Sequence, residues 1–193
     1  MRFILIEAKA LPMDFYLQRL QDVITSAIAG MKSDDFSRHP EGKWCAAEIL
    51  EHLYLTYTGT IKGFERCLNA GKPIATAPTF KQRLSTLIVT GLGYMPEGRK
   101  SPKAVIPRGV QPEKIAVEIV PQIAVMAALI QRCEERFGAN ARLVDHPIIG
   151  PLTAQQWRKF HWVHGRLHAK QIVRLKTNAP SAPASVGAGR RVP

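Results

Sequence analysis

Residues 153–176, TAQQWRKFHWVHGRLHAKQIVRLK, carry the clearest structural signal in the sequence. Thr153 and Gln156 form a T-x-x-Q capping box, in which the two side chains bond free N–H groups at a helix start. Leu152 can pack on Trp157 as a hydrophobic staple. Apolar side chains then recur at the spacing of one helical face, at Phe160, Val163, Leu167, Ile172 and Leu175. The pattern predicts a helix from Thr153 to about Lys176.

Three histidines, His161, His164 and His168, fall within this predicted helix. At 100° per residue their side chains lie within about 60° of one another and share a face. His164 and His168 are one turn apart, about 6 Å along the helix axis, and two imidazoles at this spacing can reach one metal ion. The same face carries apolar residues, so we expect it to point inward, where an unbonded imidazole costs free energy.

A third ligand is needed, because a catalytic divalent metal typically has three protein ligands and one open position. His52 is the best candidate, since it lies on a second predicted helix beside Leu53 and Leu55 and can face the core. The alternative is that these histidines are hydrogen-bonded core residues without a metal. The role of His161 stays open between a supporting residue, a spare ligand and a residue of the helix surface.

Three further segments show helical periodicity, at residues 13–31, 44–69 and 112–137. Asp14 is a suitable N-cap for the first of them. Pro121 lies inside the last, where either the helix kinks or two helices meet. Glycines lie at or just beyond the C-terminal ends, where they favour helix termination: Gly30, Gly71 and Gly138.

The connection between the second and third helices, residues 72–111, contains five prolines and is mostly loop, with a short helix expected over 80–90. A connection of this length usually has a role such as lining a pocket. The pattern predicts an all-α fold, a four-helix bundle with one long loop. We assign residues 1–176 to this domain and 177–193 to a disordered basic tail. Only residues 2–6 alternate in a way that could form a strand.

The composition excludes several classes of protein. An apolar fraction of 46% and a charged fraction of 22% in 193 residues are ordinary for a globular domain. The most apolar stretch, residues 115–130, is interrupted by polar residues and a proline, so we predict no membrane span. The N-terminal apolar run is too short for a signal peptide. Three widely spaced cysteines, Cys45, Cys67 and Cys133, indicate free thiols in a reducing compartment, which predicts a cytoplasmic protein.

The net charge of +12 is concentrated towards the C-terminus. All 15 acidic residues lie at or before Asp145, and eight lysines and arginines follow it. A basic end favours contact with an anion, although a solvated helix face with a basic tail is the simpler interpretation. The sequence has no helix-turn-helix and no basic strand with interleaved aromatic residues, so we do not expect a nucleic-acid-binding protein.

Three blocks of the sequence resemble the DinB-like superfamily of bacterial four-helix proteins. Residues 44–53, WCAAEILEHL, are similar to the helix start W-S-x-x-E-I-x-x-H-L, with Cys45 in place of the usual serine. Residues 164–172, HGRLHAKQI, are similar to H-x-x-x-H-x-x-Q-I. Residues 145–157, DHPIIGPLTAQQW, resemble the H-P-x-x-G-x-L-T-x-x-Q-W signature of one uncharacterised branch.

The resemblance covers about residues 13–176 and implies a bundle with up-down-down-up helix order. Carried over residue by residue, it implies His52, His164 and His168 as metal ligands, whereas His161 has no counterpart. Similar proteins include isomerases, metal-dependent hydrolases and S-transferases that use mycothiol, bacillithiol or glutathione. A small-molecule substrate or a low-molecular-weight thiol is therefore the implied partner. Homodimers are common among similar proteins.

The main hypothesis is a metal-dependent hydrolase or thiol S-transferase, in which three neutral histidines bind Zn²⁺ or Ni²⁺ and the ion lowers the pKa of a bound water or thiol. Glu48 and Glu51 are the nearest candidate bases, although a helix cap also explains Glu48. Gln171 would either bond within the site or pack. Three basic residues would either attract an anionic thiol or face solvent: Arg166, Lys170 and Arg174. The alternative is a non-catalytic DinB-like bundle with a structural or vacant histidine site.

Overall fold

The computed structural model describes residues 13–98 and 100–177. Helices account for most of these residues, which confirms the predicted all-α class in its main feature. No helix among the described residues combines the length and the apolarity needed to cross a bilayer. Residues 178–193 of the predicted tail, and the expected strand at residues 2–6, lie outside the described residues.

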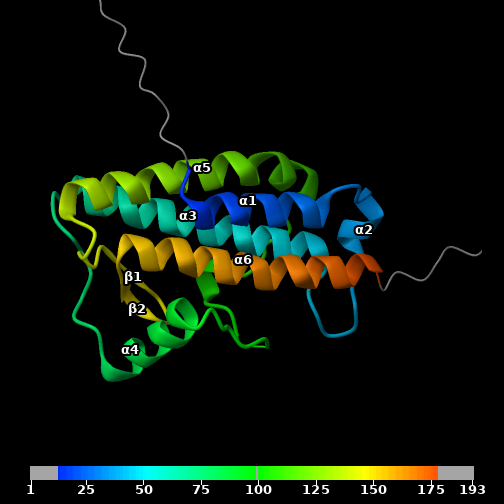
Figure 1. The fold of residues 1–193 in the computed structure, drawn as a ribbon. Coiled ribbons are helices and arrows are strands. Elements are labelled where there is room, and N and C mark those ends of the chain that lie inside the picture. The colour runs from blue at the N-terminus through cyan, green and yellow to red at the C-terminus, as the bar shows by residue number, and fades with distance from the viewer. Residues whose placement is uncertain (1–12, 99, 178–193) are drawn as a thin grey trace, which may run out of the picture.

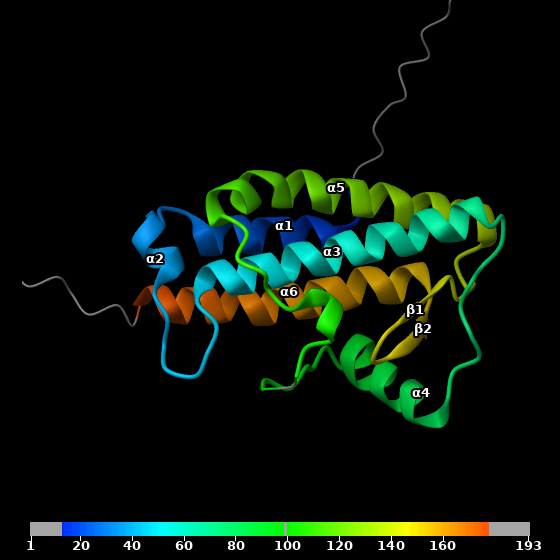
Figure 2. The same ribbon diagram turned by 180° about the vertical axis from the view of Figure 1, so that it is seen from behind.

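Four long helices form the body of the molecule: α1 (Phe15–Ile28), α3 (Ala46–Asn69), α5 (Pro112–Phe137) and α6 (Ala154–Thr177). They lie side by side in two opposite views (Figures 1 and 2). The main contacts pair α1 with α6 and α3 with α5, and weaker contacts join α3 and α5 to α6. The first and last residues of each of these helices lie close to the predicted ones, because each segment has a continuous apolar face.

The predicted start signals form as expected. The Asp14 side chain caps α1 by accepting a hydrogen bond of 2.9 Å from the N–H of Tyr16. At the start of α6, Gln156 accepts from the N–H of Thr153 at 3.0 Å, and the Thr153 hydroxyl accepts from the N–H of Gln156 at 3.3 Å. These reciprocal bonds confirm the capping box. Of the two alternatives for Pro121, the single helix is observed, since α5 continues through it.

Close packing of α1 on α6 depends on Gly165. A Cβ atom at this position would lie 2.0 Å from the Cδ1 atom of Leu20, which is fully buried on α1. The absent side chain therefore lets the two helices approach within one turn of His164 and His168. The core around this contact is close-packed and includes Leu17, Ile24, Leu53, Tyr57, Phe64, Ile123 and Met126.

A buried arginine fixes the N-terminal half of α6. Arg158 is 7% exposed, and its Nη2 atom lies 2.6 Å from Oε2 of Glu134 on α5. Its Nε atom lies 4.0 Å from Oδ2 of Asp14, the cap of α1. The arginine thus connects three helices, and its charge stays paired inside the protein, as a buried charge requires.

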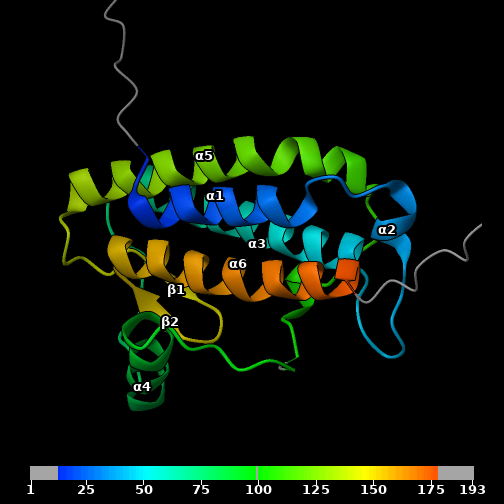
Figure 3. The ribbon, with the colours of Figure 1, turned by 45° about the vertical axis from the view of Figure 1, so that its right-hand side comes forward.

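A small lobe lies beside the N-terminal half of α6. It contains α4 (Phe80–Thr86), the π-helical turn η1 (Leu87–Gly91), and the antiparallel strands β1 (Val144–His146) and β2 (Gly150–Leu152). In Figure 3 the lobe projects from the α6 side of the molecule, on the opposite side from α5. Val144 pairs with Leu152 in the hairpin. The Thr86 hydroxyl donates to the Ile149 carbonyl at 2.9 Å, which links the lobe's helix to its hairpin.

Three local features differ from the predictions. The short helix α2 (Ser33–Ser37) was not expected, and Asp35 bonds the N–H of Lys32 at its start. The expectation of no sheet outside residues 2–6 was wrong, because strands of three residues are too short to show alternation. The segment expected as a helix over 80–90 contains both α4 and η1, and a 3-10 turn, η2 (Lys103–Val105), lies further along the same connection.

Candidate metal centre

The structure brings together the three histidines that the sequence predicted as ligands. His52 projects from α3, and His164 and His168 project from successive turns of α6. The Nε2 atom of His164 lies 3.2 Å from Nε2 of His52 and 3.1 Å from Nε2 of His168. One nitrogen from each ring lies within 4.8 Å of the others, so this buried group could hold a metal ion.

Hydrogen bonds on the far side of two rings decide which nitrogens carry protons. The Nδ1 atom of His52 lies 2.9 Å from the carbonyl oxygen of Val105, which can only accept, so Nδ1 carries the proton. The Nδ1 atom of His168 lies 2.8 Å from Oε1 of Gln171 and donates to it in the same way. Both rings therefore present an Nε2 lone pair to His164. Partners of this kind are typical of metal-bound histidines.

A divalent ion suits the two separations that His164 makes with its neighbours. Two nitrogens that each lie about 2.1 Å from one ion are about 3.0 Å apart at a right angle and about 3.4 Å apart at the tetrahedral angle. The observed separations of 3.1 and 3.2 Å fall between these values. Without an ion, the Nε2 atom of His164 can carry only one proton. That proton cannot form a full hydrogen bond to the lone pairs of both His52 and His168. A cation placed among the three nitrogens would satisfy all of them.

Burial favours the neutral form of all three rings, which is the form that binds a metal. Burial lowers the pKa of His52, against a smaller opposing effect of its bond to Val105. Burial lowers the pKa of His168 to about 4, with the neighbouring His52 contributing. Burial also lowers the pKa of His164 well below its usual value, and the surrounding histidines add to this effect. Protons therefore do not compete with a metal at neutral pH.

Aromatic rings form the walls around the three histidines. The Phe160 ring stacks on His164 with an interplanar angle of 13°, and Trp44 contacts His52 with ring centroids 5.2 Å apart. The Nδ1 atom of His164 is buried and has no hydrogen-bond partner among the described residues. His164 therefore makes its polar contacts through Nε2 alone, towards the other two rings.

His161, whose role was left open, is not part of this group. It is fully buried, and its Nε2 atom lies 3.2 Å from the Thr60 hydroxyl. That hydroxyl donates to the Thr56 carbonyl at 3.1 Å, so it accepts from the His161 N–H. His161 is therefore a hydrogen-bonded core residue. Two of the three roles considered for it, a spare ligand and a residue of the helix surface, do not agree with this position.

The two glutamates named as candidate bases are both engaged in structural bonds. Glu48 accepts from the N–H of Cys45 at 2.9 Å, as the helix-cap alternative predicted. Glu51 is 1% exposed and accepts from three backbone N–H groups of the loop after η2, those of Arg108, Gly109 and Val110, at 2.8, 2.9 and 3.1 Å. Sequence reasoning missed this loop anchor, because residues more than fifty positions apart carry no local signal of their contact.

The basic residues near the C-terminal end of α6 differ in their surroundings. Arg166 donates to the Gly93 carbonyl at 3.0 Å and lies over the Trp162 ring. Arg174 pairs with Glu97 at 3.1 Å, and Lys170 is exposed. Arg166 and Arg174 thus hold the connection between α4 and α5 against α6. Lys170 faces solvent, as one of the two alternatives predicted.

The three cysteines are free, as predicted, and all three are buried. Cys45 lies with His39 and Glu48 in a second group whose ligand atoms are within 4.8 Å of one another. Burial raises the pKa of the Cys45 thiol, and Glu48 contributes to this rise. Because the thiol is protonated and Glu48 caps α3, this second group is a weaker candidate for a metal than the three histidines.

The buried histidines predict a strong dependence of stability on pH. Burial lowers the pKa of His161 to about 3 and that of His146 to about 4, against about 6.5 in an unfolded chain. Below that value the unfolded state binds protons that the folded state does not. The free energy of unfolding is therefore at its full value above about pH 6.5. Below that pH it falls by up to about 1.4 kcal/mol per pH unit for each ring.

Urea unfolding of the metal-free protein between pH 7.5 and pH 5, a range around the histidine titration, measures this slope. The variant His161→Gln keeps a donor for Thr60 and removes one titrating ring, so we expect a shallower slope. An identical slope in the variant and the wild type would contradict the assignment of His161 as a neutral core residue.

Comparison with known proteins shows the family of the chain. No curated protein and no solved structure matches it. A family model described as a protein of unknown function, DUF1569, matches residues 10–175, a span that contains all three histidines of the candidate centre. Because this match covers most of the chain, the protein belongs to the DUF1569 family.

Proposed function

We propose that this protein is a metal-dependent enzyme of the DinB-like type, either a hydrolase or a thiol-dependent S-transferase, which uses Zn²⁺ or Ni²⁺. The convergence of three Nε2 atoms from α3 and α6, two of them fixed as lone-pair donors by Val105 and Gln171, carries the proposal. A purely structural histidine would need no such matched set of lone pairs.

When bound, a divalent ion of this kind supplies Lewis acidity that lowers the pKa of a water or thiol ligand to near neutrality. The protein's own residues hold the three imidazoles neutral and in fixed orientation. His52 and His164 are 3% and 9% exposed, whereas His168 is partly exposed, so solvent and substrate would approach from the His168 side. Trp44 and Phe160 provide apolar walls that limit water around the site.

The same proposal includes the DinB-like fold, a four-helix bundle in up-down-down-up order. The courses of the four long helices support it, since in Figure 1 α1 and α6 run in one direction and α3 and α5 in the other. The pairing of ligands from the second and fourth long helices also agrees with the motifs in residues 44–53 and 164–172. The proposed substrates are small molecules, including a low-molecular-weight thiol with an electrophilic partner.

Activity assays on metal-loaded and metal-free protein test this function. We expect hydrolysis of an activated ester, or conjugation of glutathione to an electrophile, to require Zn²⁺ or Ni²⁺ and to stop on addition of a chelator. His168→Ala should lower the rate by about 100-fold or more, because it removes a ligand rather than its supporting partner. His39→Ala, which alters an exposed histidine outside the group, should retain the activity.

The non-catalytic alternative makes a different prediction in the same experiment. A chain that binds one ion per molecule, gains stability from it and turns over neither class of substrate would support a structural metal site. A chain that shows equal activity with and without metal would contradict the proposed mechanism, whatever its metal content.

A further inference from the structure

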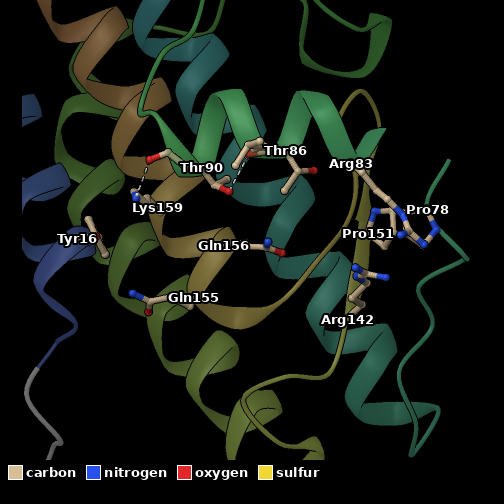
Figure 4. Close-up of a pocket in the computed structure, with 12 residues that line it drawn as sticks. Tyr16, Pro78, Arg83, Thr86, Thr90, Arg142, Pro151, Gln155, Gln156 and Lys159 are labelled. Carbon is tan, nitrogen blue, oxygen red and sulfur yellow. Dashed lines mark hydrogen bonds between the residues drawn. The ribbon is translucent and has the colours of Figure 1, made fainter. Parts of the chain in front are cut away.

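A cavity of about 520 Å³ lies between the small lobe and the N-terminal part of α6, apart from the three-histidine group. Residues of α4, η1 and β2 form one wall, and residues of α1 and α6 form the other (Figure 4). Its volume is typical of a site for a small molecule. Several lining residues come from the connection between α3 and α5, which was expected to line a pocket because of its length.

Cationic side chains line this cavity. Arg83, Arg142 and Lys159 line it, and no aspartate or glutamate from the part of the chain that the structure describes does. Within residues 13–98 and 100–177, Arg83 and Arg142 make no ion pair and no side-chain hydrogen bond. Among the same residues, Lys159 donates to the Gly91 carbonyl alone, at 3.3 Å, so two of its three N–H donors have no partner there. Arg83 and Arg142 are exposed and Lys159 is partly exposed, so solvent screens the repulsion among them. An anion between them would gain charge-assisted hydrogen bonds from their free N–H groups.

The arrangement of the cations indicates a ligand with more than one negative group. In Figure 4 the side chains of Arg83 and Arg142 lie at one end of the cavity beside Pro78 and Pro151, and Lys159 enters from α6 at the other end. Guanidinium groups bind phosphate and carboxylate oxygens in pairs, whereas a lysine acts as a point charge.

Uncharged groups in the same cavity suit the rest of such a ligand. Gln156 uses its Oε1 atom to cap α6, so its amide N–H₂ remains available as a donor. Gln155 lies beside it, and Tyr16 and Leu87 add apolar surface. The cavity therefore offers charged contacts at both ends and mixed contacts between them.

From these observations we infer that this cavity is a binding site for a small polyanion, a molecule that carries two or more phosphate or carboxylate groups. The site is independent of the proposed metal chemistry, because none of its cations belongs to the histidine group. A site of this volume, which is partly open to solvent, suits a small molecule better than a nucleic-acid backbone, which needs an extended basic groove.

Calorimetric titration of the metal-free, full-length protein with pyrophosphate and with citrate tests the inference at constant ionic strength. Metal-free protein is used so that neither anion can act by removing an ion from the histidines. We expect saturable binding of at least one of the two anions. Arg142→Gln and Lys159→Gln should each weaken it about tenfold, as expected for the loss of a charge-assisted hydrogen bond.

Lys81→Gln is the matched control, because Lys81 is an exposed cation on α4 that does not line the cavity. It should change the affinity less than twofold, in line with a screened surface charge. Tighter binding of pyrophosphate would identify a phosphorylated ligand, and tighter binding of citrate a polycarboxylate. No saturable binding up to about 10 mM, an affinity too weak for a specific site, would overturn the inference. An equal loss in Lys81→Gln would also overturn it, since the binding would then reflect only the general charge of the chain.

Discussion

Replacement of His164 by alanine is expected to abolish stoichiometric binding of Zn²⁺ or Ni²⁺. Its Nε2 atom lies 3.2 Å from that of His52 and 3.1 Å from that of His168, so the variant removes a donor that is close to both of the others. Loss of a supporting partner alone costs about 10–100-fold in metal affinity, and loss of the ligand should cost more. The metal content, measured by elemental analysis after dialysis, should therefore fall from one ion per chain to a small fraction of that value.

The stability of the wild-type protein should respond to the same ion. Metal at about 100 times its Kd raises the free energy of unfolding by about 2.7 kcal/mol when the unfolded chain does not bind it. The His164→Ala variant should show no such increase. Because this position is buried and the variant could fold poorly, His168→Gln, at a partly exposed ligand, provides a second test.

His39→Ala is the control for this prediction, since it removes a histidine from the second group, with Cys45 and Glu48, and leaves the first intact. It should bind metal like the wild type. If His39→Ala loses the metal and His164→Ala retains it, the ion binds at the start of α3, and the three-histidine assignment is wrong.

Replacement of Glu51 by alanine is expected to cause the largest loss of stability among single substitutions near the site. Its buried carboxylate accepts hydrogen bonds from three consecutive backbone N–H groups, at residues 108–110. Hydrogen bonds to a charged group contribute about 1.5–3 kcal/mol each, and some of the freed N–H groups would recover bonds to water. We therefore expect a loss of about 3 kcal/mol or more in the free energy of unfolding, measured by urea denaturation.

The same substitution should also weaken metal binding. The loop that Glu51 holds directly follows Val105, whose carbonyl fixes the proton on Nδ1 of His52. If the loop loosens, His52 loses its fixed orientation, and we expect metal affinity to fall by about tenfold. Glu65→Ala is the matched control on the same helix, because Glu65 is exposed, and surface substitutions of this kind usually change stability by about 0.5 kcal/mol or less. Equal stability of the two variants would contradict the role of Glu51 as a loop anchor.

The sequence predicted the long helices well because their signals are local. Helical periodicity, the capping box at Thr153 and Gln156, and the cap at Asp14 all act within a few residues, and all three are present in the structure. The hairpin of β1 and β2 was missed for the opposite reason. Its two strands have three residues each, and they pack against α3, α4 and α6, which are distant in the sequence or carry no local signal of the contact.

For the site, the sequence predicted which histidines meet but not what supports them. The i, i+4 spacing of His164 and His168 and the inward face of His52 were sufficient to bring three rings together. The carbonyl of Val105 could not be predicted as a partner of His52, because 53 positions separate them and a backbone oxygen has no residue-type signature. For the same reason, the meeting of Arg83, Arg142 and Lys159 around one cavity has no counterpart in the sequence pattern.

Diffraction from crystals of zinc-loaded protein, recorded above and below the zinc absorption edge, tests the metal assignment most directly. We predict one strong anomalous peak bounded by the Nε2 atoms of His52, His164 and His168. Failure to observe a peak there in fully loaded protein, or a single peak beside Cys45 instead, would contradict the account and leave a helical scaffold with hydrogen-bonded histidines.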